Sequence, residues 1–142
     1  MTVQSLLVRF AVIYLGLLLA IGLAGGAQSN TAANTGALIG AVMFASISFT
    51  KRNKRDFSAV EKRNAILGMV AIDAVLQTGV ACVLLRSAPS AIGSTSMLLS
   101  VLFVTLLHAP VIWFFSGWAS KQMALGVARE AAKRQQEFSA TH

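Results

Sequence analysis

The sequence predicts an all-α integral membrane protein, a bundle of four transmembrane helices followed by a C-terminal amphipathic helical extension. Hydrophobic residues make up 56% of its 142 residues and charged residues only 12%. The hydrophobic residues gather in four long stretches, separated by short polar loops. A helix rises about 1.5 Å per residue, so about 20 residues cross a bilayer core of about 30 Å. We expect one membrane domain, with helices at about 5–24, 32–50, 59–85 and 94–118 and a cytoplasmic tail at 119–138.

The distribution of positive charge predicts the orientation of the chain. Every lysine and arginine except Arg86 lies at the start of the first helix, in the 51–64 loop or in the tail. The positive-inside rule then places both termini and the 51–64 loop in the cytoplasm. A net charge of +7 would also suit a nucleic-acid-binding protein. The low charged fraction and the segregation of the charges exclude that class, so no nucleic-acid partner is expected.

The basic loop also has a second interpretation, as a contact surface for anionic lipid headgroups. Two tryptophans lie toward the cytoplasmic end of the fourth helix, a position typical of anchors at the membrane interface. The residues expected to contact headgroups are Lys51, Arg52, Lys54, Arg55, Lys62, Arg63, Trp113 and Trp118.

The second helix carries rows of small residues. Its apolar run is short, so the helix must include residues 31–34 or cross a thinned bilayer. Rows of small residues let helix backbones approach closely, which drives helix association in lipid. The rows serve either packing within the protein's own bundle or an interface with another protein. They consist of Gly36 with Gly40 and, beside them, Ala37 with Ala41 and Ala45.

The third and fourth helices have clear boundary signals. Ser58 and Glu61 form an S-x-x-E capping box, which predicts that the third helix begins directly after Ser58. Pro89 marks the turn that follows this helix. Pro110 should kink the fourth helix, which neighbouring helices can tolerate in a membrane. We expect the tail at 119–138 to lie near the membrane surface as an amphipathic helix, or alternatively to dock on a partner.

A few ionisable and polar residues are expected inside the bilayer. Asp73 is the one acidic residue within an apolar run, where a charge costs several kcal/mol unless it is paired or protonated. Gln77 follows one turn later on the same face, and His108 lies at a similar depth of about 13–15 Å by helix rise. Arg9 is shallower, but its long side chain can reach toward Asp73. This cluster is either a proton or ion site or a set of interhelical polar contacts that fixes the bundle.

The sequence offers no motif of an enzyme or of a metal site. It contains no H-E-x-x-H, no Walker A loop and no G-x-S-x-G, and no Cys/His cluster has the spacing of metal ligands. Cys82 is the single cysteine and cannot form an internal disulfide. We therefore expect no enzymatic activity, no metal and no cofactor.

The stretch NTGALIGAVMFASISFTKRNKR, followed by AVEKRNAILG, resembles a group of small, uncharacterised four-helix bacterial inner-membrane proteins. These proteins share a short second helix rich in Asn, Ala and Gly and a basic linker that ends in E-K-R. The resemblance covers residues about 30–68 and implies a four-helix architecture and a multi-pass location in the bacterial inner membrane. The positions that carry it are Asn34, Gly36, Ala37, Gly40, Ala41, Phe49 and Glu61–Lys62–Arg63.

Two classes of function fit these features. The first is a non-enzymatic protein that binds transmembrane segments, as an accessory subunit of a membrane complex or as an immunity protein against a membrane-active toxin. Its partners would be anionic lipid and a membrane protein, or other copies of the chain. The second is a small proton-coupled transporter or channel centred on Asp73 and His108.

Overall fold

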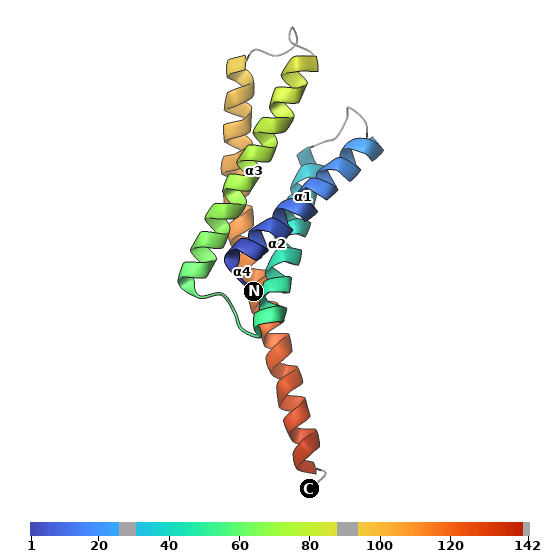
Figure 1. Ribbon diagram of the computed structural model, residues 1–142, viewed down its shortest axis with the longest axis vertical. Helices are drawn as coiled ribbons and strands as arrows, with labels where there is room; N and C mark the ends of the chain where they lie inside the picture. The colour runs from blue at the N-terminus through green and yellow to red at the C-terminus, as the bar shows by residue number, and fades with distance from the viewer. Residues whose placement is uncertain (26–30, 88–93, 141–142) are drawn as a thin grey trace.

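The computed structural model describes residues 1–25, 31–87 and 94–140, and these residues form four helices and no strand. The helices are α1 (Val3–Gly25), α2 (Thr31–Asn53), α3 (Ala59–Ser87) and α4 (Ser94–Ala140), as Figure 1 shows. All four are long and apolar enough to cross a membrane. The prediction of an all-helical chain with four candidate membrane spans is confirmed.

The turn between α2 and α3 is defined by local hydrogen bonds. Lys54 adopts a left-handed backbone conformation with φ of 52°, which ends α2 directly after Asn53. The backbone N–H of Glu61 donates to Ser58 Oγ at 3.3 Å, and the N–H of Ser58 donates to Glu61 Oε2 at 2.9 Å. These reciprocal bonds satisfy donors that the first turn of a helix leaves free. The predicted capping box is confirmed, and α3 begins at Ala59.

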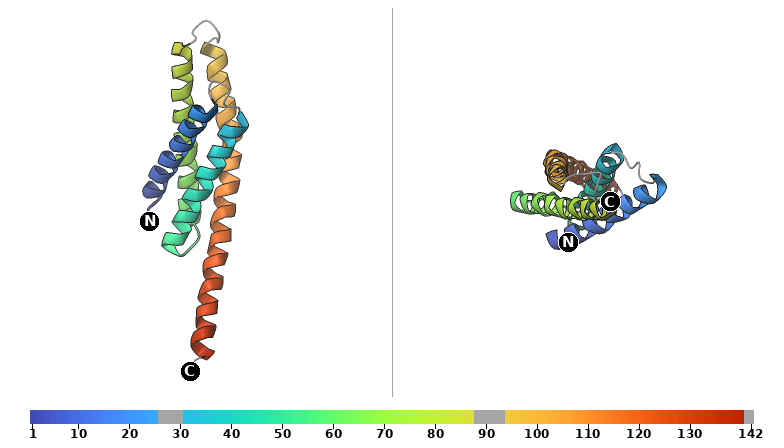
Figure 2. Two further views of the ribbon diagram at one scale, coloured as in Figure 1. Left: turned by 90° about the vertical axis from the view of Figure 1, so that its right-hand side faces the viewer. Right: turned by 90° about the horizontal axis from the view of Figure 1, so that it is seen from above.

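Helix α4 continues without a break through Pro110 and past Trp118, over 47 residues. By helix rise this length is about 70 Å, more than twice a bilayer core of about 30 Å. The tail at 119–138 is thus helical, as predicted, and it continues in line with α4; its position near the membrane surface stays a prediction. Its residues are mostly Ala, Lys, Arg, Gln and Glu with no proline, so nothing ends the helix at Trp118. In Figures 1 and 2 this part of α4 extends beyond the other three helices. The predicted turn at Pro89, which precedes α4, lies outside the described residues.

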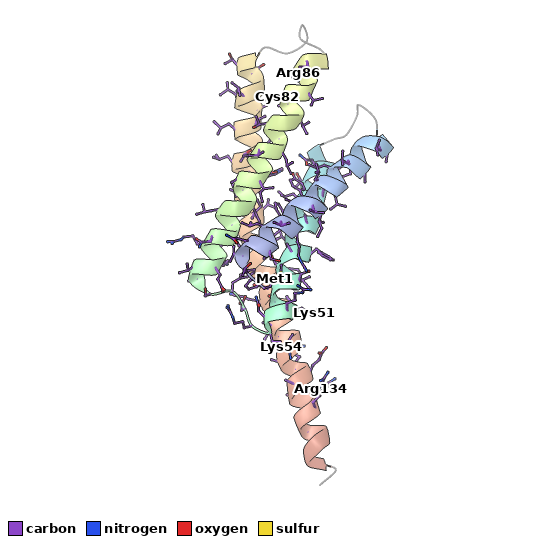
Figure 3. All side chains as sticks on the ribbon, in the orientation of Figure 1. Met1, Lys51, Lys54, Cys82, Arg86 and Arg134 are labelled. Atoms are coloured by element: carbon purple, nitrogen blue, oxygen red, sulfur yellow. The ribbon has the colours of Figure 1, made fainter. Side chains whose placement is uncertain are left out.

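The charged residues define two ends of the molecule. Figure 3 labels Met1, Lys51 and Lys54 where the other helices end and α4 extends beyond them, here called the basic end, and Arg86 at the opposite, far end. The N-terminal ammonium of Met1 donates to Asn53 Oδ1, and Asn53 Nδ2 donates to the Met1 carbonyl oxygen at 3.1 Å. The N-terminus is thus fastened to the end of α2, beside the basic turn.

The four helices pack tightly only near the basic end. The hairpin of α3 and α4 extends beyond the hairpin of α1 and α2 at the far end, as both side views show (Figures 1 and 2). Leu98, Leu102 and Phe103 on α4 are each more than 60% exposed there. The fully buried core lies closer to the basic end. It consists mainly of Leu6, Phe10, Tyr14, Leu38, Val42, Phe49, Met69 and Ile112.

Helices α1 and α3 approach closely at Gly68. A Cβ atom at Gly68 would lie 2.5 Å from Leu7 Cδ1 and 2.7 Å from Leu7 Cδ2, so Leu7 would have to move. We expect Gly68→Val to lower the free energy of unfolding by about 1–3 kcal/mol, a typical cost of overpacking. Gly79→Val on the same helix is the matched control, because a Cβ there meets nothing within 4 Å.

Unfolding of the purified variants in mixed detergent micelles measures both effects. Leu7→Ala in the Gly68→Val background should restore part of the loss, because the smaller side chain frees the space. Equal stability of the Gly68→Val and Gly79→Val proteins would contradict the close approach of α1 and α3 at this point.

Candidate functional site

Each of the four helices contributes a polar side chain to one network in the core. The residues are Tyr14 on α1, Asn34 on α2, Asp73 and Gln77 on α3, and His108 on α4. Asp73 is 0% exposed and His108 is 3% exposed. Because every helix takes part, the network fixes the relative depth and rotation of all four.

Asp73 is the centre of this network, and both of its carboxylate oxygens have partners. The Tyr14 hydroxyl donates to Asp73 Oδ1 at 2.8 Å. Gln77 Nε2 donates to Asp73 Oδ2 at 2.8 Å, and His108 Nδ1 lies 3.0 Å from the same oxygen. Gln77 Nε2 is also 3.1 Å from His108 Nδ1. The carboxylate, the amide and the imidazole therefore form a closed triangle of polar atoms.

The contact between Asp73 and His108 holds a single proton. It belongs either to Nδ1, which then donates to the carboxylate, or to Oδ2, which then donates to the imidazole nitrogen. Both side chains are buried, so this proton is shared within the core of the bundle.

Tyr14 and Asn34 extend the network to the first two helices. The Tyr14 hydroxyl oxygen lies 3.1 Å from Asn34 Oδ1. One hydroxyl hydrogen cannot serve both Asp73 and an amide oxygen, so the Asn34 amide fits best with its NH₂ group donating to the hydroxyl. The Tyr14 ring is fully buried and stacks on Phe10, with 5.5 Å between the ring centroids. This stack holds the hydroxyl in the direction of α3.

The structure brings together three of the four polar residues that the sequence singled out. Asp73, Gln77 and His108 meet, whereas Arg9 makes no hydrogen bond or ion pair with Asp73 in the described part of the chain. Arg9 precedes Tyr14 by five residues, which is about 140° around a helix. Since Tyr14 points at Asp73, Arg9 lies on a different side of α1.

Sequence reasoning missed Tyr14 and Asn34 as members of the network. Tyr14 is the single tyrosine of the chain and lies in the middle of an apolar run. A buried tyrosine hydroxyl usually finds a hydrogen-bond partner, so this residue could have been paired with Asp73 by depth alone. Asn34 begins the second apolar run at the far end and gave no comparable signal.

The two rows of small residues on α2 have different surroundings. Ala37, Ala41 and Ala45 are 5%, 0% and 0% exposed, so this row packs inside the bundle. Gly36 and Gly40 are exposed. A Cβ at Gly36 would meet nothing within 4 Å, and one at Gly40 only Leu17 Cδ1 at 3.8 Å. The glycine row therefore forms a flat outward surface on α2 that the protein's own helices do not cover.

The cationic residues at the basic end also differ among themselves. Arg55 Nη1 and Nη2 donate to the two carboxylate oxygens of Glu61, each at 2.7 Å. The hydrogen bond and the negative charge of Glu61 raise the pKa of Arg55 above its ordinary value. Lys62 instead lies over the ring of Trp113, with Nζ 5.1 Å from the centroid. Lys51, Arg52, Lys54, Arg63 and Trp118 are exposed.

No family model, no curated protein and no solved structure matches this chain. The resemblance of residues 30–68 to small bacterial inner-membrane proteins therefore stays a prediction. Among residues 1–25, 31–87 and 94–140, no three His, Cys, Asp or Glu side chains gather as metal ligands would.

Proposed function

We propose that this protein is a non-enzymatic membrane protein that binds transmembrane helices of another protein through the outward glycine row of α2. The observation that carries the proposal is the exposure of Gly36 and Gly40 beside a fully packed alanine row. Glycines at a spacing of four allow a second helix to approach closely, and such contacts drive association where lipid removes the hydrophobic drive. An accessory subunit of a membrane complex and an immunity protein against a membrane-active toxin both need such a surface.

The Asp73 network supports this proposal by acting within the bundle. Its carboxylate oxygens are occupied by Tyr14, Gln77 and His108. Polar contacts of this kind hold neighbouring helices in register inside a membrane. Asn34 on α2 joins this network through Tyr14, so the helix that carries the glycine row is also tied to the bundle.

A proton-coupled transporter or channel is the second candidate. The 3.0 Å contact between Asp73 and His108 favours it, because a proton can pass between a carboxylate and an imidazole at hydrogen-bonding distance. The two side chains are 0% and 3% exposed, however, so neither touches an open path to solvent. We rank the binding role first for this reason.

We also propose that the basic end faces the cytoplasm, in a bacterial inner membrane, with both termini inside. Cysteine labelling with a membrane-impermeant maleimide tests the orientation in a Cys82→Ser background. Ser29→Cys and Ser90→Cys should be labelled in intact cells, whereas Arg52→Cys should be labelled only after the membrane is opened. The opposite pattern would reverse the orientation.

Co-purification from native membranes tests the binding role directly. The tagged chain should bring a membrane protein in a fixed ratio, identified by mass spectrometry, and the same protein should be recovered at several detergent concentrations. Recovery of the chain with lipid alone would contradict the proposal.

A further inference from the structure

A pocket of about 310 Å³ lies at the basic end between α3 and α4. It is an open hollow rather than an enclosed cavity, since Leu67 and Trp113 in its wall are 62% and 59% exposed. One part of its wall is cationic and the rest is aromatic or aliphatic. It is lined by Ala59, Lys62, Arg63, Ile66, Leu67 and Trp113.

Lys62 is held across this pocket by contacts with α4. Its ammonium lies 5.1 Å from the centroid of the Trp113 ring, within the range of a cation–π contact. A Cβ atom at Gly117 would lie 2.5 Å from Lys62 Nζ, so the ammonium occupies the space that this glycine leaves open. The side chain therefore reaches from α3 to α4 with its charge in a defined place.

The positive charge of this pocket is not balanced by the protein. Glu61 is the nearest acidic residue in sequence, but both of its carboxylate oxygens are bound to Arg55 at 2.7 Å. In the described part of the chain, neither Lys62 nor Arg63 forms a salt bridge. The pocket therefore presents two cations next to an aliphatic surface and beside a tryptophan, a residue that is enriched at membrane interfaces.

We infer that this pocket binds one anionic phospholipid, with its phosphate between Lys62 and Arg63. An acyl chain of the same molecule lies along Ile66 and Leu67, which continue the pocket wall toward the bilayer interior. Free inorganic phosphate carries the same charged group as the lipid headgroup. Only the lipid also has an acyl chain that covers the aliphatic wall, so the wall favours the lipid. This is one defined site, distinct from a general attraction of the basic turn to a charged membrane.

Quenching of Trp113 fluorescence by brominated lipids tests this site. Trp118→Phe leaves Trp113 as the only tryptophan, because the chain has two. In vesicles of phosphatidylcholine, brominated phosphatidylglycerol should quench Trp113 more strongly than brominated phosphatidylcholine at the same density. Lys62→Gln with Arg63→Gln should weaken the preference about 25-fold, since each basic residue near an anionic lipid contributes roughly a factor of five.

Three further measurements distinguish this site from a general charge effect, a loss of fold and a site for free phosphate. Lys51→Gln with Arg52→Gln removes the same charge from elsewhere at the basic end and should leave the preference in place. Lys62→Arg keeps a cation at this position and should also keep the preference for phosphatidylglycerol. This result would show that the loss in the glutamine variant comes from the missing charge and not from a loss of fold. Excess inorganic phosphate should not compete. Equal quenching by both lipids, an equal loss in the Lys51 and Arg52 variant, or competition by phosphate would each overturn the inference.

Discussion

Asp73→Leu is expected to destabilise the four-helix bundle strongly, whereas Asp73→Asn should leave it nearly as stable as the wild type. Leucine removes the acceptor for Tyr14, Gln77 and His108 at once. Each buried polar group left without a partner costs about 1–3 kcal/mol, so the total loss should reach several kcal/mol. Asparagine keeps one acceptor oxygen in place. Interhelical hydrogen bonds in membranes average about 0.6 kcal/mol, so the Asp73→Asn variant should lose about 1 kcal/mol or less of its free energy of unfolding.

Unfolding in mixed detergent micelles measures this series, with Tyr14→Phe as the matched control. Phenylalanine keeps the stack on Phe10 and removes only the hydroxyl that donates to Asp73. Its cost should be close to that of Asp73→Asn and far below that of Asp73→Leu. Equal stability of the leucine and asparagine variants would contradict a structural role for the network.

The same asparagine variant separates the two candidate functions. An amide cannot release a proton at an accessible pH, so Asp73→Asn abolishes any proton transfer through this site while keeping the fold. We expect liposomes with the wild-type protein to show no more proton flux across a pH gradient than empty liposomes. Flux in the wild type that disappears in the asparagine variant would favour the transporter over the binding role.

Gly36→Leu and Gly40→Leu are expected to keep the fold and to lose the partner. Side chains at these positions would extend away from the bundle, because a Cβ there meets no atom or only Leu17 Cδ1 at 3.8 Å. Their stability should therefore be within about 0.5 kcal/mol of the wild type, as for surface substitutions elsewhere. A leucine on this face would hold a second helix away, so the partner should fall to background in co-purification.

Ala41→Leu provides the matched contrast on the same helix. Ala41 is 0% exposed, so a larger side chain overpacks the core and should cost about 1–3 kcal/mol. The two rows of α2 should therefore give opposite results. Substitutions in the glycine row should abolish binding and keep the fold, whereas the substitution in the alanine row should weaken the fold. Retention of the partner by both glycine variants would show that the glycine row is not the interface.

The four helices follow from the sequence because apolar length alone decides which segments can cross a bilayer. Helix rise also fixes depth, which is why Asp73 and His108 could be matched before their contact was seen. The rotation of each helix about its own axis does not follow from the sequence in this way. Lipid and core are both apolar, so the inward and outward faces of α2 have similar composition. The sequence therefore could not tell that the alanine row faces inward and the glycine row outward.

The same lack of contrast accounts for the contact that was expected of Arg9. Arg9 and Tyr14 both lie on α1 within reach of Asp73 in depth, and only their rotation decides that Tyr14 makes the contact. The helical extension after Trp118 was predicted from its composition, and its position near the membrane surface stays a prediction. Its continuation in line with α4 depends on the absence of any residue that would end the helix there.

The unbroken length of α4 gives the protein a mechanical property. A single helix connects the segment beside His108 with Ala140, so a change of tilt at one end is carried to the other except for bending at Pro110. The part beyond Trp118 is about 33 Å long by helix rise, and a tilt of about 10° within the membrane would displace its tip by about 6 Å. A small change in the tilt of α4 among the other helices would therefore be amplified along the part that extends beyond Trp118.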